Sequence, residues 1–137
     1  MSTEIRGIRN KNPLNLRIGN DWVGEVPEPT DPDFEQFTSM TYGLRAGFIV
    51  LRRYIVRYHR NTVPKIISSW SPRTENATKK YIKAVCEWTG FGRNQVLSFD
   101  DRDTMEALVS AMCRYETGCT IPRDVINHGY DLASGMK

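Results

Sequence analysis

The sequence predicts a mainly α-helical domain with a small β-hairpin near its N-terminus. Apolar residues recur at helical spacing from residue 42 onward, and capping residues and glycines mark the ends of those stretches. The first forty residues lack this spacing. The chain has 137 residues, of which 39% are hydrophobic and 26% charged, which is typical of one domain folded around one core.

The segment "RGIRNKNPLNLR", residues 6–17, carries Asn10, Asn12 and Asn15. Neither a helical nor a strand pattern explains so many amides in so short a stretch. In residues 17–25, Ile18, Trp22 and Val23 flank a polar Gly-Asn-Asp, which predicts a short hairpin.

Residues 26–37, "VPEPTDPDFEQF", contain three prolines and are predicted to form a loop. Phe34 and Phe37 are expected to hold this loop against the body of the domain.

The rest of the chain is expected to be helical. Gly90 and Gly118 are the predicted stops of the third and fourth helices, and Asp101 or Asp103 caps the start of the fourth. The predicted helices cover residues 42–59, 63–70, 75–88, 100–118 and 122–135.

Composition excludes several classes of protein. The sequence has no apolar run of membrane-spanning length and no signal-peptide pattern, so we expect a protein made in the cytoplasm without a signal peptide. A virion or another carrier would then bring it to the periplasm or cell wall. Cys86, Cys113 and Cys119 fit neither a disulfide framework nor a metal pair, and His59 and His128 are isolated. We therefore expect no metal and no cofactor.

One carboxylate stands out in the fourth predicted helix. Glu116 occupies the next position on the apolar stripe of that helix, at its C-terminal end. Burial disfavours the charged form of a carboxylate, and the negative end of the helix dipole acts in the same direction. Both effects favour the protonated form that a general acid needs near neutral pH. The alternative is a glutamate at a frayed helix end, turned to solvent. The stripe consists of Met105, Leu108, Val109 and Met112.

The aromatic residues also allow two interpretations. They suit either a cleft in which sugars stack or the hydrophobic core, where most aromatic residues of a small domain lie. The set consists of Trp22, Trp70, Trp88, Tyr42, Tyr54 and Tyr81.

Taken together, the motifs resemble a known group of proteins. "GIRNKNPLNLR" is similar to the GIRNNNPGNIR opening of phage and prophage virion proteins associated with lysozyme-like peptidoglycan hydrolases, although Lys11 and Leu14 replace Asn and Gly of that pattern. The similarity continues through W-x-G, F-x-x-F, G-L-R-A, IISSWSPRTEN-x-T-x-x-Y and a closing E-T-G.

The order of the motifs implies a circular permutation. Lytic transglycosylases and flagellar-type glucosaminidases begin with a catalytic E-S-G, which is followed by an amide-rich loop, a G-x-x-Y-L helix and A-Y-N-A-G…Y. Similar pieces occur here, but E-T-G comes last, as a permuted lysozyme-like fold would place it. The resemblance thus implies one lysozyme-like α+β domain spanning residues 1–137.

The resemblance also implies roles for individual residues. Glu116 takes the place of the acid that protonates the glycosidic oxygen, and Asp21 or Glu25 is a candidate second carboxylate. Asn12 and Asn15 are expected to lie near Glu116 and bind the sugar. Glu75 and Asn76 are either sugar ligands or merely the cap of the third helix. The implied substrate-binding residues are Asn10, Asn12, Asn15, Trp22, Glu75, Asn76 and Tyr81.

The leading hypothesis is a peptidoglycan-cleaving glycosidase, either a muramidase or a lytic transglycosylase, that acts on the β-1,4 bond between N-acetylmuramic acid and N-acetylglucosamine. Its partners would be glycan strands and virion, tail or secretion-machine components, with no nucleic acid and no membrane. The alternative is a non-catalytic virion or tail protein that serves assembly or cell-wall binding. A third hypothesis, a small nucleic-acid-binding protein, is weakened by the net charge of only +3.

Overall fold

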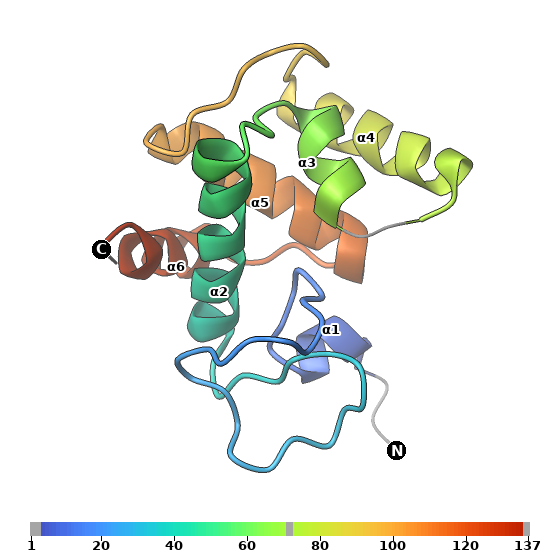
Figure 1. Ribbon diagram of the computed structural model, residues 1–137. Coiled ribbons are helices and arrows are strands. Elements are labelled where there is room, and N and C mark those ends of the chain that lie inside the picture. The colour runs from blue at the N-terminus through green and yellow to red at the C-terminus, as the bar shows by residue number, and fades with distance from the viewer. Residues whose placement is uncertain (1–3, 71–72, 136–137) are drawn as a thin grey trace.

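The fold is helical from residue 40 onward, and a mostly irregular segment precedes it (Figure 1). The structure is a computed structural model that describes residues 4–70 and 73–135. The π-helix η1 directly continues α2. The helices are α1 (Arg6–Arg9), α2 (Met40–Arg52), η1 (Arg53–Arg57), α3 (Val63–Trp70), α4 (Glu75–Thr89), α5 (Arg102–Thr117) and α6 (Arg123–Ser134).

The helices predicted from residue 42 onward are confirmed, with small changes at their ends. The Thr74 hydroxyl caps α4 and the Asp101 carboxylate caps α5, each accepting a backbone N–H of the first turn. Gly90 and Gly118 end α4 and α5 with φ of 80° and 73°. Glycine adopts this left-handed conformation without steric cost, which explains why both helices stop there.

The β-hairpin predicted over residues 17–25 is wrong. Within the described residues, Arg17 forms an isolated antiparallel bridge with Phe34, and Glu25 forms one with Phe37. The two ends of the expected hairpin therefore pair with a later segment and not with each other. Burial explains this choice, because Phe37 packs in a small cluster with Leu16 and with Ala46 of α2. Phe37 thus holds the proline-rich loop against the domain, as expected.

Helix α1 is a feature that the sequence did not predict. It consists of a single turn, too short for apolar spacing to indicate it. Its Gly7 is buried, and α1 lies near the C-terminal end of α5. A methyl group added at Gly7 would lie 3.1 Å from the Thr117 side chain. This close approach brings the amide-rich segment to Glu116.

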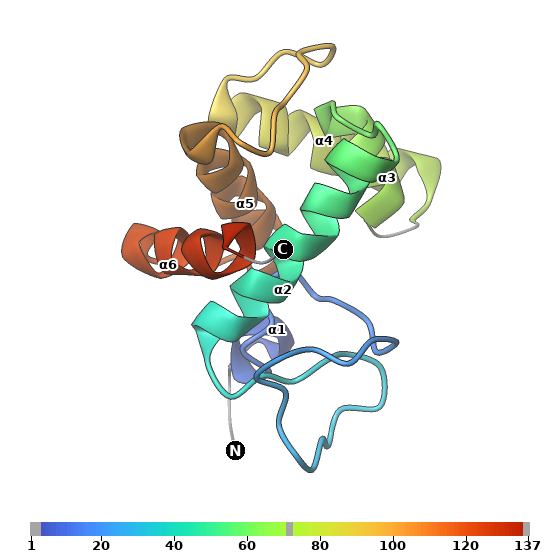
Figure 2. The same ribbon diagram turned by 60° about the vertical axis from the view of Figure 1, so that its left-hand side comes forward.

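The core surrounds α2, which Figures 1 and 2 show between α6 on one side and α3 and α4 on the other. Leu44, Phe48 and Leu51 of α2 are fully buried there. Gly129 lets α6 approach α2, because an added Cβ would lie 2.7 Å from the Leu44 Cβ. No helix within the described residues is long and apolar enough to cross a membrane.

Candidate functional site

The Glu116 carboxylate is buried at the end of α5, where three segments of the chain meet. Its side chain is 3% exposed. Asn15 Nδ2 donates a hydrogen bond of 3.0 Å to Glu116 Oε1, and Arg73 Nη2 lies 3.1 Å from the same oxygen. Glu116 Oε2 is buried and has no hydrogen-bond partner among the described residues. The alternative of a frayed, solvent-facing glutamate is therefore wrong.

The amide of Asn15 is positioned by an unusual backbone conformation. Asn15 has a φ of 53°, in the left-handed region that asparagine tolerates better than most residues. Gly7 makes room for the amide, since a Cβ at Gly7 would lie 2.9 Å from Asn15 Oδ1. The predicted proximity of Asn15 to Glu116 is confirmed by their hydrogen bond.

Asn10 and Asn12 hold the loop and do not face a ligand. Asn12 is fully buried, and its amide donates to the carbonyls of Leu16 at 2.9 Å and Glu35 at 3.0 Å. Asn10 is 2% exposed and donates to the Asp31 carboxylate at 2.8 Å. The expectation that Asn10 and Asn12 bind sugar is thus corrected to a structural role, because buried amides need internal partners.

Tyr81 lies near the Glu116 carboxylate and, like Asn10 and Asn12, is buried where a ligand does not reach it. It is fully buried, its ring stacks on Tyr115 with centroids 4.0 Å apart, and its hydroxyl donates to the Met112 carbonyl at 3.5 Å. Burial, with the nearby Glu116 carboxylate, raises the pKa of Tyr81 well above its ordinary value. Direct contact between Tyr81 and a sugar, as expected from the resemblance, is therefore excluded in this conformation.

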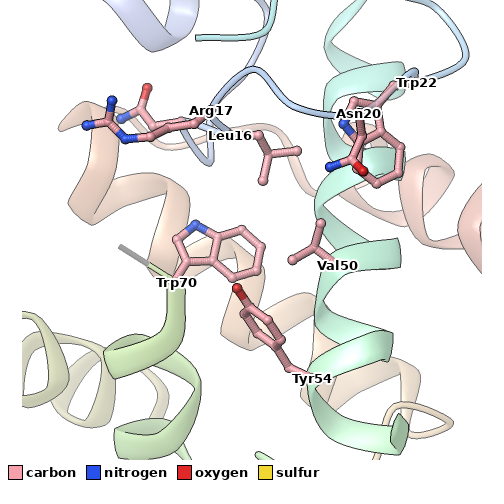
Figure 3. Close-up of a pocket in the computed structure, with 8 residues that line it drawn as sticks. Leu16, Arg17, Asn20, Trp22, Val50, Tyr54 and Trp70 are labelled. Atoms are coloured by element: carbon pink, nitrogen blue, oxygen red, sulfur yellow. The ribbon is translucent and has the colours of Figure 1, made fainter. Parts of the chain in front are cut away.

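An aromatic pocket adjoins the Glu116 site. It has a volume of about 170 Å³. Figure 3 shows Leu16 and Arg17 of the N-terminal segment, Val50 and Tyr54 of α2 and η1, and the Trp70 ring around it. Asn15 lines the pocket and also donates a hydrogen bond to the Glu116 carboxylate. The described lining residues are Asn15, Leu16, Arg17, Asn20, Trp22, Val50, Tyr54 and Trp70.

Three contacts hold Tyr54 and Trp70 in the wall of this aromatic pocket. Trp70 Nε1 donates to the Leu14 carbonyl at 3.0 Å, which joins the end of α3 to the amide-rich segment. Tyr54 meets the Trp70 ring edge to face, with centroids 5.9 Å apart, and its hydroxyl donates to the Ser69 carbonyl at 3.1 Å. Of the aromatic residues that the sequence singled out, Trp22, Tyr54 and Trp70 line this pocket.

The two candidate second carboxylates have different surroundings. Asp21 is exposed, and its neighbours Asn20 and Trp22 both line the aromatic pocket. Glu25 instead approaches Glu35, which the sequence did not single out.

The Glu25–Glu35 pair is unusual because neither carboxyl is fully hydrogen-bonded. Glu35 is 6% exposed, and one carboxyl oxygen of each residue is buried without a hydrogen-bond partner among the described residues. Burial, together with the hydrogen bond to the Glu25 carboxyl, raises the pKa of Glu35 to about 7. Only protonation lets two carboxyl groups hydrogen-bond with each other.

Glu75 and Asn76 lie at the exposed start of α4. Thr74, not Glu75 or Asn76, provides the side-chain cap of that helix. Glu75 forms an ion pair with Lys79 at 3.2 Å along the helix surface. Glu75 also borders a hollow between α3 and α4, which Arg73 lines as well. Sequence patterns missed Arg73 as a partner of Glu116, since nothing in its spacing indicates that contact.

Comparison with known proteins links the chain to a phage. No protein-family model matches it. Its sequence is 40% identical over 131 residues to "Protein P5" of Pseudoalteromonas phage PM2, an alignment that spans 92% of this chain and 80% of the phage protein. The expected relation to phage proteins is thereby confirmed at this level. The chain belongs to the family of protein P5 of Pseudoalteromonas phage PM2.

Proposed function

We propose that the chain is a phage glycosidase that cleaves peptidoglycan at the β-1,4 bond between N-acetylmuramic acid and N-acetylglucosamine, with Glu116 as the general acid. One observation carries the proposal. The buried Glu116 carboxylate accepts a hydrogen bond from Asn15, and Asn15 also lines a pocket together with Trp22, Tyr54 and Trp70. Aromatic faces bind the apolar faces of sugar rings, and a carboxylic acid beside them is the group that glycoside cleavage requires.

In this proposal, Asn15 sets the orientation of the acid. Its amide donates to Glu116 Oε1, so that Oε2 is the oxygen left to carry the proton. Transfer of that proton to the glycosidic oxygen lets the C1–O bond break, so that the departing sugar leaves as a neutral alcohol. Water, or in a transglycosylase the C6 hydroxyl of the N-acetylmuramic acid, then bonds to C1 and gives up the proton that restores the acid. Arg73 pairs with the other oxygen, Oε1, and Oε2 is buried, so side chains around the carboxylate must move before a bound strand can reach Oε2. Asp21 is the remaining candidate second carboxylate, since Glu25 is engaged with Glu35.

A second candidate is a virion component that binds the cell wall or other virion proteins without catalysis. The relation to a phage protein fits this candidate with no further assumption. The ion pair between Arg73 and Glu116 also favours it, because a guanidinium stabilises the ionised carboxylate whereas a general acid must be protonated.

The experiment compares native chain, Glu116→Gln and Glu87→Gln on purified sacculi, measuring released muropeptides and bound protein separately. Glu87 is an exposed control on α4 that undergoes the same chemical change. We expect Glu116→Gln to retain binding and lose release by a factor of about 100 or more, as for loss of a general acid. Equal release by Glu116→Gln would remove Glu116 from the mechanism. Binding without release by the native chain would establish the second candidate.

A further inference from the structure

We infer that arginines around the aromatic pocket select glycan strands that carry carboxylate groups over neutral β-1,4 polymers of N-acetylglucosamine. This inference rests on the proposed function and names the substrate class of the same site. Its starting point is the charge distribution of the sequence. Residues 36–74 contain seven Lys or Arg and no Asp or Glu, although the whole chain has a net charge of only +3.

Three of the arginines of the chain adjoin the aromatic pocket. Arg17 lines it directly. The Arg53 guanidinium lies over the Trp22 ring at 5.5 Å from its centroid, and the Arg60 guanidinium lies 5.7 Å from the centroid of Tyr54. Trp22 and Tyr54 are both lining residues, so Arg53 and Arg60 each lie against a residue of the pocket wall. Arg60 also lines a second hollow, together with Lys65.

These arginines are available to a ligand. Arg17, Arg53 and Arg60 are exposed, and within residues 4–70 and 73–135 none of them forms an ion pair with a carboxylate. Arg6, by contrast, is paired with Asp31 and Asp33. No described lining residue of the pocket is acidic. Guanidinium groups that already stack on aromatic rings keep their N–H donors free for carboxylate oxygens.

A peptide-bearing glycan strand matches this arrangement better than a nucleic acid does. Its carboxylates are attached to every second sugar, through the lactyl and peptide groups of N-acetylmuramic acid, and neutral N-acetylglucosamine lies between them. A nucleic acid would instead bring a phosphate with every nucleotide, whereas the cations here are separate guanidinium groups. Aromatic faces for sugars with separate cations at the rim therefore fit an anionic glycan.

The test measures binding of the full chain to native sacculi and to sacculi whose carboxyl groups have been converted to amides. The variants are Arg53→Gln/Arg60→Gln, the charge-conserving Arg53→Lys/Arg60→Lys, and Lys80→Gln/Lys83→Gln on the exposed face of α4 as a control with the same charge loss. Melting curves confirm that each variant is folded.

We expect the Gln pair to weaken binding to native sacculi by about fivefold, as for two exposed ion pairs. The Lys pair should restore most of that loss, and the α4 control should bind like the native chain. Amidation of the sacculi should weaken binding of the native chain by a similar factor. The native chain and the Gln pair should then bind the amidated sacculi equally tightly.

Three results would overturn the inference. The Gln pair could bind native sacculi as tightly as the native chain, the native chain could bind amidated sacculi equally well, or duplex DNA at the same charge concentration could displace the chain completely. In each case, continued release of muropeptides would leave the proposed function standing. A chain that neither binds nor cleaves any sacculus would instead overturn both proposals.

Discussion

Asn15 Nδ2 donates a hydrogen bond of 3.0 Å to Glu116 Oε1, joining two residues that lie 101 positions apart in the chain. The bond connects the N-terminal segment to the last turn of α5. Asn15, which supplies the donor, also lines the aromatic pocket. It therefore couples the folding of the first residues to the geometry of the candidate acid.

Replacing Asn15 with Asp should damage both stability and the site. The change removes the donor and sets a second carboxylate against Glu116, which is 3% exposed. We expect a loss of about 1–3 kcal/mol in the free energy of unfolding at pH 8, measured by urea denaturation, with recovery near pH 4 where a proton can be shared.

Asn15→Gly is the matched control for this substitution. Glycine accepts the left-handed φ of 53° at this position, so it removes the amide without adding a charge. If Asn15→Asp and Asn15→Gly unfolded alike at both pH values, the carboxylate at residue 116 would not be close to residue 15.

Gly7→Ala should disturb the site by crowding the side chains of Asn15 and Thr117. The added Cβ would lie 2.9 Å from Asn15 Oδ1 and 3.1 Å from Thr117 Cγ2, so both side chains must move away from residue 7. We expect a loss of about 1–3 kcal/mol in the free energy of unfolding, typical of overpacking, and reduced sacculus binding. Gly19→Ala serves as the control because a Cβ there has no neighbour within 4 Å. Equal stability of the two variants would contradict the close contact of α1 with α5.

Stability should fall as the pH rises from about 4.5 to about 7, because of Glu35. The pKa of Glu35 is raised from 4.5 to about 7, so between these values the folded chain holds a proton that the unfolded chain has released. The folded state then binds more protons, and stability decreases with increasing pH.

Glu35→Gln should remove this dependence and stabilise the chain at pH 8 by about 1–3 kcal/mol, since an amide needs no proton to hydrogen-bond with Glu25. Urea denaturation at pH 5 and pH 8 measures the effect, with exposed Glu28→Gln as the control. A native chain that is as stable at pH 8 as at pH 5, and unchanged by Glu35→Gln, would show that the two carboxyl groups are not paired.

Helices were predictable from the sequence because their signals are local. Apolar spacing located α2 to α6, and Gly90 and Gly118 marked two helix ends through their own backbone preference. The hairpin prediction was wrong because the alternation of Ile18, Trp22 and Val23 is a local pattern. It does not show that a later segment of the chain pairs with both ends of the expected hairpin. Burial of Phe37 beside Ala46 brings the 33–38 segment between the two ends, and that contact is non-local.

For the site, the stripe position of Glu116 correctly indicated a buried carboxylate, and motif order indicated its proximity to Asn15. The sequence could not distinguish Asn15 from Asn10 and Asn12, because all three are amides in one loop. Only the fold shows that the Asn10 amide is hydrogen-bonded to Asp31. It also shows that the Asn12 amide is hydrogen-bonded to the carbonyls of Leu16 and Glu35. Arg73 and Glu35 were missed because no spacing pattern connects Arg73 to Glu116, 43 residues away, or Glu35 to Glu25 across the proline-rich loop.

Mass spectrometry of the soluble products from purified sacculi incubated with the native chain tests the central claim most directly. A Glu116-centred glycosidase is expected to release disaccharide-peptides cut between N-acetylmuramic acid and N-acetylglucosamine. Intact glycan strands with cleaved peptides, or no soluble product from sacculi that retain the bound chain, would contradict it.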